Sequence, residues 1–132
     1  MTPAASADRA IRKSSLRAIE RSPYCQTANS GSSAILVFSR TARGDVAPIR
    51  KIQGPDTGLK KPVGLYVDTK NDEVWATNPE LHTATVYKRT AEGNVKPLRT
   101  LRSAPDGAAA PGIGNPGGIA YDPVREQILV PN

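Results

Sequence analysis

The chain has 132 residues, a formal net charge of +6 and a single cysteine, Cys25. One cysteine excludes an internal disulfide, and the sequence has no run of 18 apolar residues that could form a membrane-spanning helix. The first residues also lack the apolar core of a secretory signal, so the sequence leaves the localisation open. Twelve prolines and eleven glycines indicate many turns, which favours short strands over long helices.

Residues 1–27 form a basic arm that does not follow the pattern of the remaining chain. Five basic and two acidic side chains give this arm a net charge of +3, and the much longer remainder carries the other +3. Ser6 could cap a helix that runs to about Arg21, and Pro23 would end it. The alternatives are a disordered arm, a transit peptide, a basic anchor for nucleic acid or anionic lipid, and a segment that stands where an upstream repeat would be.

The remaining chain, residues 28–132, is organised around a sequence that occurs twice. Residues 37–52 align without a gap with residues 86–101 at an offset of 49 residues, and Val, Arg, Thr, Ala, Gly and Pro recur at matching positions. Residues 58–68 align with residues 112–122 at an offset of 54, because the second copy has a longer loop before this segment. A repeat of about 50 residues lies in the range of propeller blades.

Glycine and proline positions predict one hairpin in each copy of the repeat. Gly44 and Gly93 are followed by Asp and Asn, and such dipeptides make tight turns that tolerate a positive φ. Proline lacks an N–H, so it is tolerated only in an edge strand. Pro48 and Pro97 therefore place the second strand of each hairpin at the rim of its sheet.

The other hairpin of each copy is nearly continuous in apolar residues, as expected of strands that are covered on both faces. The repeat register also requires a strand at residues 25–29, but Cys-Gln-Thr is a poor strand sequence. We predict an all-β fold of eight short antiparallel strands after the arm: residues 34–39, 46–52, 64–67, 73–77, 83–88, 95–101, 118–121 and 127–130.

The recurring residues also resemble a known family. They form the pattern Pro-x-Gly-Leu/Ile-x-x-Asp, an apolar strand that ends in Asn, and then x-Val-Phe/Tyr-x-Arg-x-Ala-x-Gly-Asn/Asp-Val-x-Pro-x-Arg-x-Ile/Leu. This pattern resembles bacterial NHL-like β-propeller repeats over residues 28–132. The resemblance implies two blades' worth of a six-bladed type of propeller, and it allows the full-length protein to be exported.

Two blades' worth of strands cannot close a propeller, which typically needs four to eight blades. The resemblance therefore leaves two expectations. The chain is a fragment of a larger propeller, or three copies form a homotrimer that completes a six-bladed ring, with each split blade shared between two subunits.

The sequence contains no set of residues that forms a catalytic or metal site. His82 is the only histidine, and it lacks carboxylate or thiol partners at ligand spacing, so we expect a solvated loop residue. Cys25 has no visible histidine partner and is expected to be inert. Asp68 and Asp122 recur at strand ends, which indicates that they cap turns. We predict no cofactor and no enzymatic activity.

Recurring polar residues are the candidates for binding. By the resemblance, Asn29, Asn78 and Asn132 could approach a central channel, where related lactonase-type enzymes hold a divalent metal, although a recurring residue is more simply structural. Arginines recur on the predicted outer strands, where they could contact RNA phosphates or discourage pairing between sheet edges. These arginines are Arg40, Arg89, Arg50 and Arg99.

We therefore predict a non-enzymatic repeat module that serves as a scaffold for a protein or small-molecule ligand. The alternatives are a part of a lactonase-like, metal-dependent hydrolase and an RNA-binding propeller surface. The arginines come without a set of aromatic side chains for stacking bases, so a nucleic-acid partner is the less favoured reading.

Overall fold

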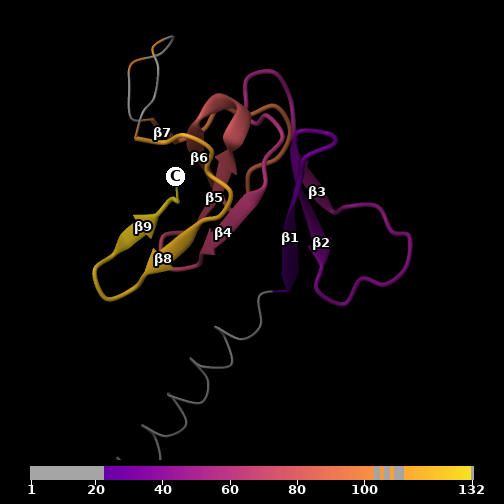
Figure 1. Ribbon diagram of the computed structural model, residues 1–132. Helices are drawn as coiled ribbons and strands as arrows, with labels where there is room; N and C mark the ends of the chain where they lie inside the picture. The colour runs from indigo at the N-terminus through magenta and orange to yellow at the C-terminus, as the bar shows by residue number, and fades with distance from the viewer. Residues whose placement is uncertain (1–22, 103–104, 106–107, 109–111, 132) are drawn as a thin grey trace, which may run out of the picture.

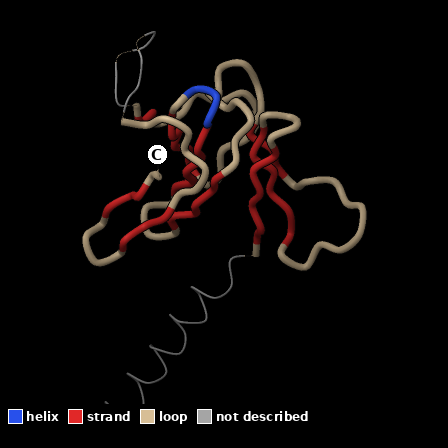
Figure 2. The backbone as a smooth tube through the Cα atoms, in the orientation of Figure 1, coloured by secondary structure: helices blue, strands red, loops and turns tan. Residues whose placement is uncertain are grey.

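The structure is a computed structural model that describes residues 23–102, 105, 108 and 112–131, and these residues form nine strands in three antiparallel sheets (Figures 1 and 2). The predicted all-β fold of antiparallel sheets is confirmed. The helix predicted from Ser6 to Arg21 lies outside the described residues. Within the described residues, no helix has the length and apolar character needed to cross a membrane.

The three sheets follow one another along the chain. Sheet A contains β1 (Tyr24–Asn29), β2 (Ala34–Ser39) and β3 (Arg50–Ile52), and each strand pairs with the next. Sheet B contains β4 (Gly64–Asp68), β5 (Glu73–Asn78), β6 (Thr83–Lys88) and β7 (Arg99–Leu101) in the same sequential order. Sheet C contains β8 (Ala120–Asp122) and β9 (Gln127–Leu129). A single 3₁₀ turn, η1 (Pro79–Leu81), joins β5 to β6.

The repeat in the sequence is also a repeat in strand register. In sheet A, Ile35 pairs with Ile52 and Val37 with Arg50. In sheet B, the residues 49 positions later make the same pairs, because Ala84 pairs with Leu101 and Val86 with Arg99. The two copies therefore build the same local structure from partly different side chains.

Four predicted strands are shorter than expected, namely β3, β7, β8 and β9, and for β3 and β7 the reason is proline. The strands predicted at residues 46–52 and 95–101 begin only at Arg50 and Arg99, two residues after Pro48 and Pro97. The first N–H after each proline does pair, since Ile49 donates to the Val37 carbonyl and Leu98 to the Val86 carbonyl, both at 2.7 Å. β3 and β7 are nevertheless the edge strands of their sheets, so the predicted rim position is confirmed.

The structure also contains a strand that the prediction of eight strands left out. β1 covers residues 24–29 and pairs with β2 at all six positions, from Tyr24 with Ser39 to Asn29 with Ala34. Residues 24–27, which we placed in the arm, therefore belong to sheet A. The sequence of β1 is a poor strand former, but without β1 the backbone groups on that side of β2 would lack strand partners, and this tertiary demand overrides local propensity.

The core lies between sheets A and B. Its members are drawn from both sheets and from the segment that joins them, and they are Ile35, Ile52, Leu59, Val74, Ala76 and Tyr87. β5 is buried along almost its whole length, as predicted for a strand covered on both faces, and its partner β6 is buried as well. The same prediction is wrong for the strands of the second copy, because sheet C has no neighbouring sheet of described residues on its outer side. β8 and β9 contain no buried residue, so sheet C lies at the margin of the molecule.

The outer strand of sheet A is also tied to a turn of sheet B. Gly93 donates its N–H to the Lys51 carbonyl at 2.8 Å and accepts from the Gln53 N–H at 3.1 Å. Gly93 has a φ of 78°, and its counterpart Gly44 has a φ of 70°, so the predicted positive φ is confirmed at both glycines. The predicted tight turns are wrong, because strand pairing ends at Val37 with Arg50 and at Val86 with Arg99, which leaves longer loops. The loop around Gly93 thus connects sheets A and B.

Candidate functional site

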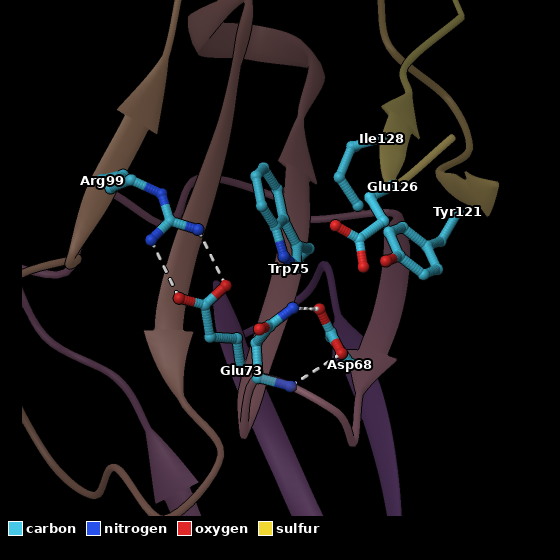
Figure 3. Close-up of a pocket in the computed structure, with 8 residues that line it drawn as sticks. Asp68, Glu73, Trp75, Arg99, Tyr121, Glu126 and Ile128 are labelled. Atoms are coloured by element: carbon cyan, nitrogen blue, oxygen red, sulfur yellow. Dashed lines mark hydrogen bonds and ion pairs between the residues drawn. The ribbon is translucent and has the colours of Figure 1, made fainter. Parts of the chain in front are cut away.

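A cleft of about 420 Å³ lies between sheets B and C (Figure 3). The two sheets meet there through the rings of Tyr66 and Tyr121, whose centroids are 5.5 Å apart, and through an ion pair between Lys70 and Glu126. Eight residues line the cleft, namely Asp68, Asn71, Glu73, Trp75 and Arg99 from sheet B and Tyr121, Glu126 and Ile128 from sheet C.

One wall of the cleft is built on Trp75, which projects from the central strand β5. The guanidinium carbon of Arg99 lies 5.4 Å from the centroid of the Trp75 ring. Arg99 also holds both carboxylate oxygens of Glu73, at 2.8 and 2.7 Å, and this hydrogen-bonded ion pair raises the pKa of Arg99. A planar, two-point pair of this kind fixes orientation as well as distance, so Trp75 and Arg99 form a defined surface.

The indole N–H of Trp75 has no hydrogen-bond acceptor among the described residues. The side chain is 7% exposed and its Nε1 atom is buried. Figure 3 shows the ring nitrogen turned toward the Asp68 side of the cleft. A buried donor without an acceptor costs about 1–3 kcal/mol, so most buried indole groups have a partner. Trp75 therefore presents an unused donor to whatever occupies the cleft.

The floor of the cleft is a turn that Asp68 caps. Its Oδ1 accepts from the backbone N–H groups of Lys70 and Asn71 at 2.9 and 3.0 Å, and its Oδ2 accepts from the Asn71 side chain at 2.7 Å. Burial alone would raise the pKa of Asp68, but these hydrogen bonds outweigh burial and the pKa is lowered from 3.8. The carboxylate is therefore ionised and held in place.

The same turn occurs in sheet C. Asp122 Oδ1 accepts from the N–H groups of Val124 and Arg125 at 2.9 and 3.2 Å, just as Asp68 does 54 residues earlier. Asp72 and Glu126 end the two turns with φ values of 58° and 54°. The prediction that Asp68 and Asp122 cap turns is confirmed.

The predicted asparagines do not lie in this cleft. Asn78 is fully buried, and its side chain accepts from the Lys60 N–H at 3.1 Å and donates to the Thr85 hydroxyl at 3.1 Å. Asn29 is half-buried and accepts from the Ser32 N–H at 3.1 Å. Asn29 thus bonds the loop that follows its strand, whereas Asn78 ties the loop before β4 to β6. Asn132 lies outside the described residues.

The four predicted arginines are spread over separate contacts. Arg50 lies 5.1 Å from the Tyr24 ring centroid and donates to the Arg89 carbonyl at 3.0 Å, whereas the Arg89 side chain pairs with Asp72 at 2.7 Å. Arg40 is exposed just after β2. Of the six predicted binding residues, the structure brings only Arg99 into the cleft.

The other residues considered for chemistry stand apart from one another. His82 is exposed after η1, as expected of a loop residue, and its Nδ1 contacts the Gly114 carbonyl. Cys25 is exposed on β1. The described part of the chain contains no group of three or more His, Cys, Asp or Glu side chains that could hold a metal ion.

Sequence reasoning missed most of the cleft because it followed the residues that recur. Trp75 is the only tryptophan, and the repeat places Gln26 and Leu129 at the equivalent positions. Tyr121 also differs between the copies, since its counterpart in the first copy is Val67. The signal that could have found the cleft is therefore the set of large side chains that differ between copies.

A scan of known protein families found no match to this chain, and a search of curated proteins found none either. The likeness to NHL-like repeats consequently remains an inference from the residues quoted above.

Proposed function

We propose that this chain is a non-enzymatic repeat module of the β-propeller kind, and that it acts as a scaffold whose ligand binds in the cleft between sheets B and C. Support for the propeller comes from the sequential strand order of sheet B and from the identical register of the two copies. Packing of sheet A on sheet B also resembles the contact between neighbouring blades.

The single observation that carries the binding proposal is the buried, unpaired indole N–H of Trp75 in a cleft of about 420 Å³. Small-molecule sites are typically concave and combine aromatic surface with placed polar groups. This cleft is concave and contains the rings of Trp75 and Tyr121, and most of the remaining lining is polar, which favours a polar ligand. The rigid pair of Arg99 and Glu73 supplies the pre-organised support that such a site needs.

The protein partner, the lactonase-like hydrolase and the RNA surface have no comparable support. A metal-dependent hydrolase needs a cluster of metal ligands, and the described residues contain none. The recurring arginines Arg50, Arg89 and Arg99 already bind groups of this chain. Assembly into a homotrimer also meets an obstacle in β1. By the repeat, β1 has the position in sheet A that β9 has in sheet C. If sheet C of one copy joined β2 and β3 of another, β9 would need the place beside β2, and β1 would have to dissociate from it.

The proposal is tested with the only tryptophan of the chain as reporter. The indole ¹H–¹⁵N resonance of Trp75 is recorded while mixtures of sugars, amino acids, nucleosides, carboxylic acids and amines are added. We expect at least one mixture to shift this resonance, and the Arg99→Ala variant to weaken the response. Arg50→Ala, the same position of the other copy, serves as the matched control and should respond like the unaltered protein. If no mixture moves the resonance, the cleft is not a ligand site.

A further inference from the structure

Two of the three carboxylates that line the cleft are paired with basic side chains of the protein, and the third is held by hydrogen bonds. Glu73 is paired with Arg99, and Glu126 is paired with Lys70, whose pKa is raised chiefly by the hydrogen bond to that carboxylate. The Asp68 carboxylate receives three hydrogen bonds from its own turn. These carboxylates would repel an anionic ligand, and a cationic ligand would compete with Arg99 and Lys70 for Glu73 and Glu126, whereas an uncharged ligand disturbs neither ion pair.

Hydrogen-bonding groups of both kinds nevertheless face the cleft. The Trp75 N–H is a donor that requires an acceptor. Ionised carboxylates accept several hydrogen bonds each, so Glu73 and Glu126 keep capacity for donors beyond their ion pairs. A ligand that bonds both the Trp75 N–H and these carboxylates must therefore offer acceptors and donors together. The hydroxyl group combines the two on one atom.

Apolar surface completes the lining. The Tyr121 ring and the Ile128 side chain border the cleft opposite Trp75, as Figure 3 shows. Such faces pack against C–H groups, and the cleft volume of about 420 Å³ suits a small ring rather than a polymer chain. From these three features we infer that the cleft takes a neutral polyhydroxylated ring, of the monosaccharide or cyclitol class. This inference rests on the proposed function.

The experiment follows the Trp75 indole resonance during separate titrations with D-glucose, D-galactose and myo-inositol. Cyclohexanol is the matched ligand control, because it has the six-membered ring of myo-inositol but one hydroxyl. Tetramethylammonium and acetate test the two signs of charge. We expect a Kd of about 1 mM for at least one polyol, in keeping with a ligand of this size, and no saturable shift with the other three compounds.

Variants separate the role of the indole N–H from that of the ring. Trp75→Phe should weaken polyol binding about fivefold in ligand-observed NMR, because one hydrogen bond is lost while the aromatic wall is kept. Gln26→Leu, at the equivalent place in sheet A, should leave the affinity unchanged. If Trp75→Phe does not fold, the comparison of myo-inositol with cyclohexanol on the unaltered protein still decides the question.

The outcomes distinguish this inference from the proposed function. Saturable binding of acetate or tetramethylammonium without polyol binding would overturn the polyol class and leave a ligand cleft. Equal binding of cyclohexanol and myo-inositol would overturn the need for several hydroxyls. Absence of any response, here and with the wider mixtures, would overturn both.

Discussion

The Tyr87 hydroxyl is a buried polar group of the core. Tyr87 is 1% exposed, its hydroxyl donates to the Thr57 carbonyl, and it lies 2.9 Å from the Thr85 hydroxyl. Replacing it with Phe leaves a buried carbonyl without its donor, so we expect Tyr87→Phe to lower the free energy of unfolding by about 1–3 kcal/mol. Urea unfolding measures this loss. Tyr66→Phe is the control, and it should change stability by less than about 0.5 kcal/mol.

The same residue predicts how stability changes at alkaline pH. Burial raises the pKa of Tyr87 from 10.0 to about 12. The unfolded chain therefore loses this proton at lower pH than the folded chain, so the stabilisation is complete below pH 10 and is lost as the pH rises toward 12. Unfolding curves across this range should converge for the native protein and Tyr87→Phe. Parallel curves would show that Tyr87 ionises as readily in the folded state as in the unfolded state.

At the scale of single elements, the two capped turns form a matched pair. The pKa values of Asp68 and Asp122 are both lowered from 3.8, and in Asp122 the hydrogen bond with Arg125 is the largest cause. A lowered pKa stabilises the fold above the unfolded value, and this contribution disappears as the pH falls below about 4. Asp68 is 4% exposed, whereas Asp122 is half-buried, so the acid-sensitive contribution should be larger at Asp68.

Asparagine at these positions keeps the turn geometry but removes the charge. We expect Asp68→Asn to cost about 1 kcal/mol at neutral pH and to flatten the loss of stability in acid, with a smaller effect for Asp122→Asn. Chemical unfolding at pH 7 and at pH 3 measures both variants. A larger effect at Asp122 would contradict the expectation that the more buried Asp68 contributes more to stability.

The link between sheets A and B depends on a close approach at Gly54. Its φ is 145°, and a Cβ atom there would lie 2.3 Å from Asn94 Oδ1. Asn94 cannot easily move, since Oδ1 accepts from the Asp56 N–H and Nδ2 donates to the Asp56 carboxylate, both at 2.9 Å. Gly54→Ala should therefore destabilise the protein by about 1–3 kcal/mol through overpacking and backbone strain.

Two variants control the Gly54 prediction. Gly44 has a φ of 70° with no atom within 4 Å of a built Cβ, so Gly44→Ala reports the cost of positive φ alone, about 1 kcal/mol. Asn94→Ala combined with Gly54→Ala should recover part of the loss, because the side chain that clashes is gone. If the double variant is as unstable as the sum of the two single variants, steric overlap is not the cause.

These elements also show what the sequence could and could not predict. The positive φ of Gly44 and Gly93 and the turn caps Asp68 and Asp122 were predictable from the sequence. Few residue types suit such positions, and each of these residues occurs in both copies of the repeat. β1 was not, since its pairing is imposed by β2 rather than by its own residues. The cleft was not either, because Trp75, Tyr121 and Glu126 come from strands and turns about 50 residues apart, and only packing of sheet C on sheet B brings them together.

For the whole molecule, burial predicts that stability is graded from sheet to sheet. β5 and β6 are buried along almost their full length, whereas β8 and β9 have three residues each and none is buried. A two-stranded hairpin is marginal in water without further cover, and the cover from sheet B includes the Tyr66 and Tyr121 rings. Backbone amides of β8 and β9 should therefore exchange with deuterium about 100-fold faster than those of β5 and β6.

Dependence on protein concentration then tests self-assembly. If copies associate through sheet C, protection of β8 and β9 should rise with concentration, and light scattering should give a mass of about three times the 14.0 kDa of one chain for the homotrimer. Because β1 already occupies its place beside β2, we expect instead a monomer whose β8 and β9 exchange rapidly at every concentration. Slow exchange in a monomer would show that sheets B and C unfold as one unit, and the cleft between them would then be rigid before any ligand arrives.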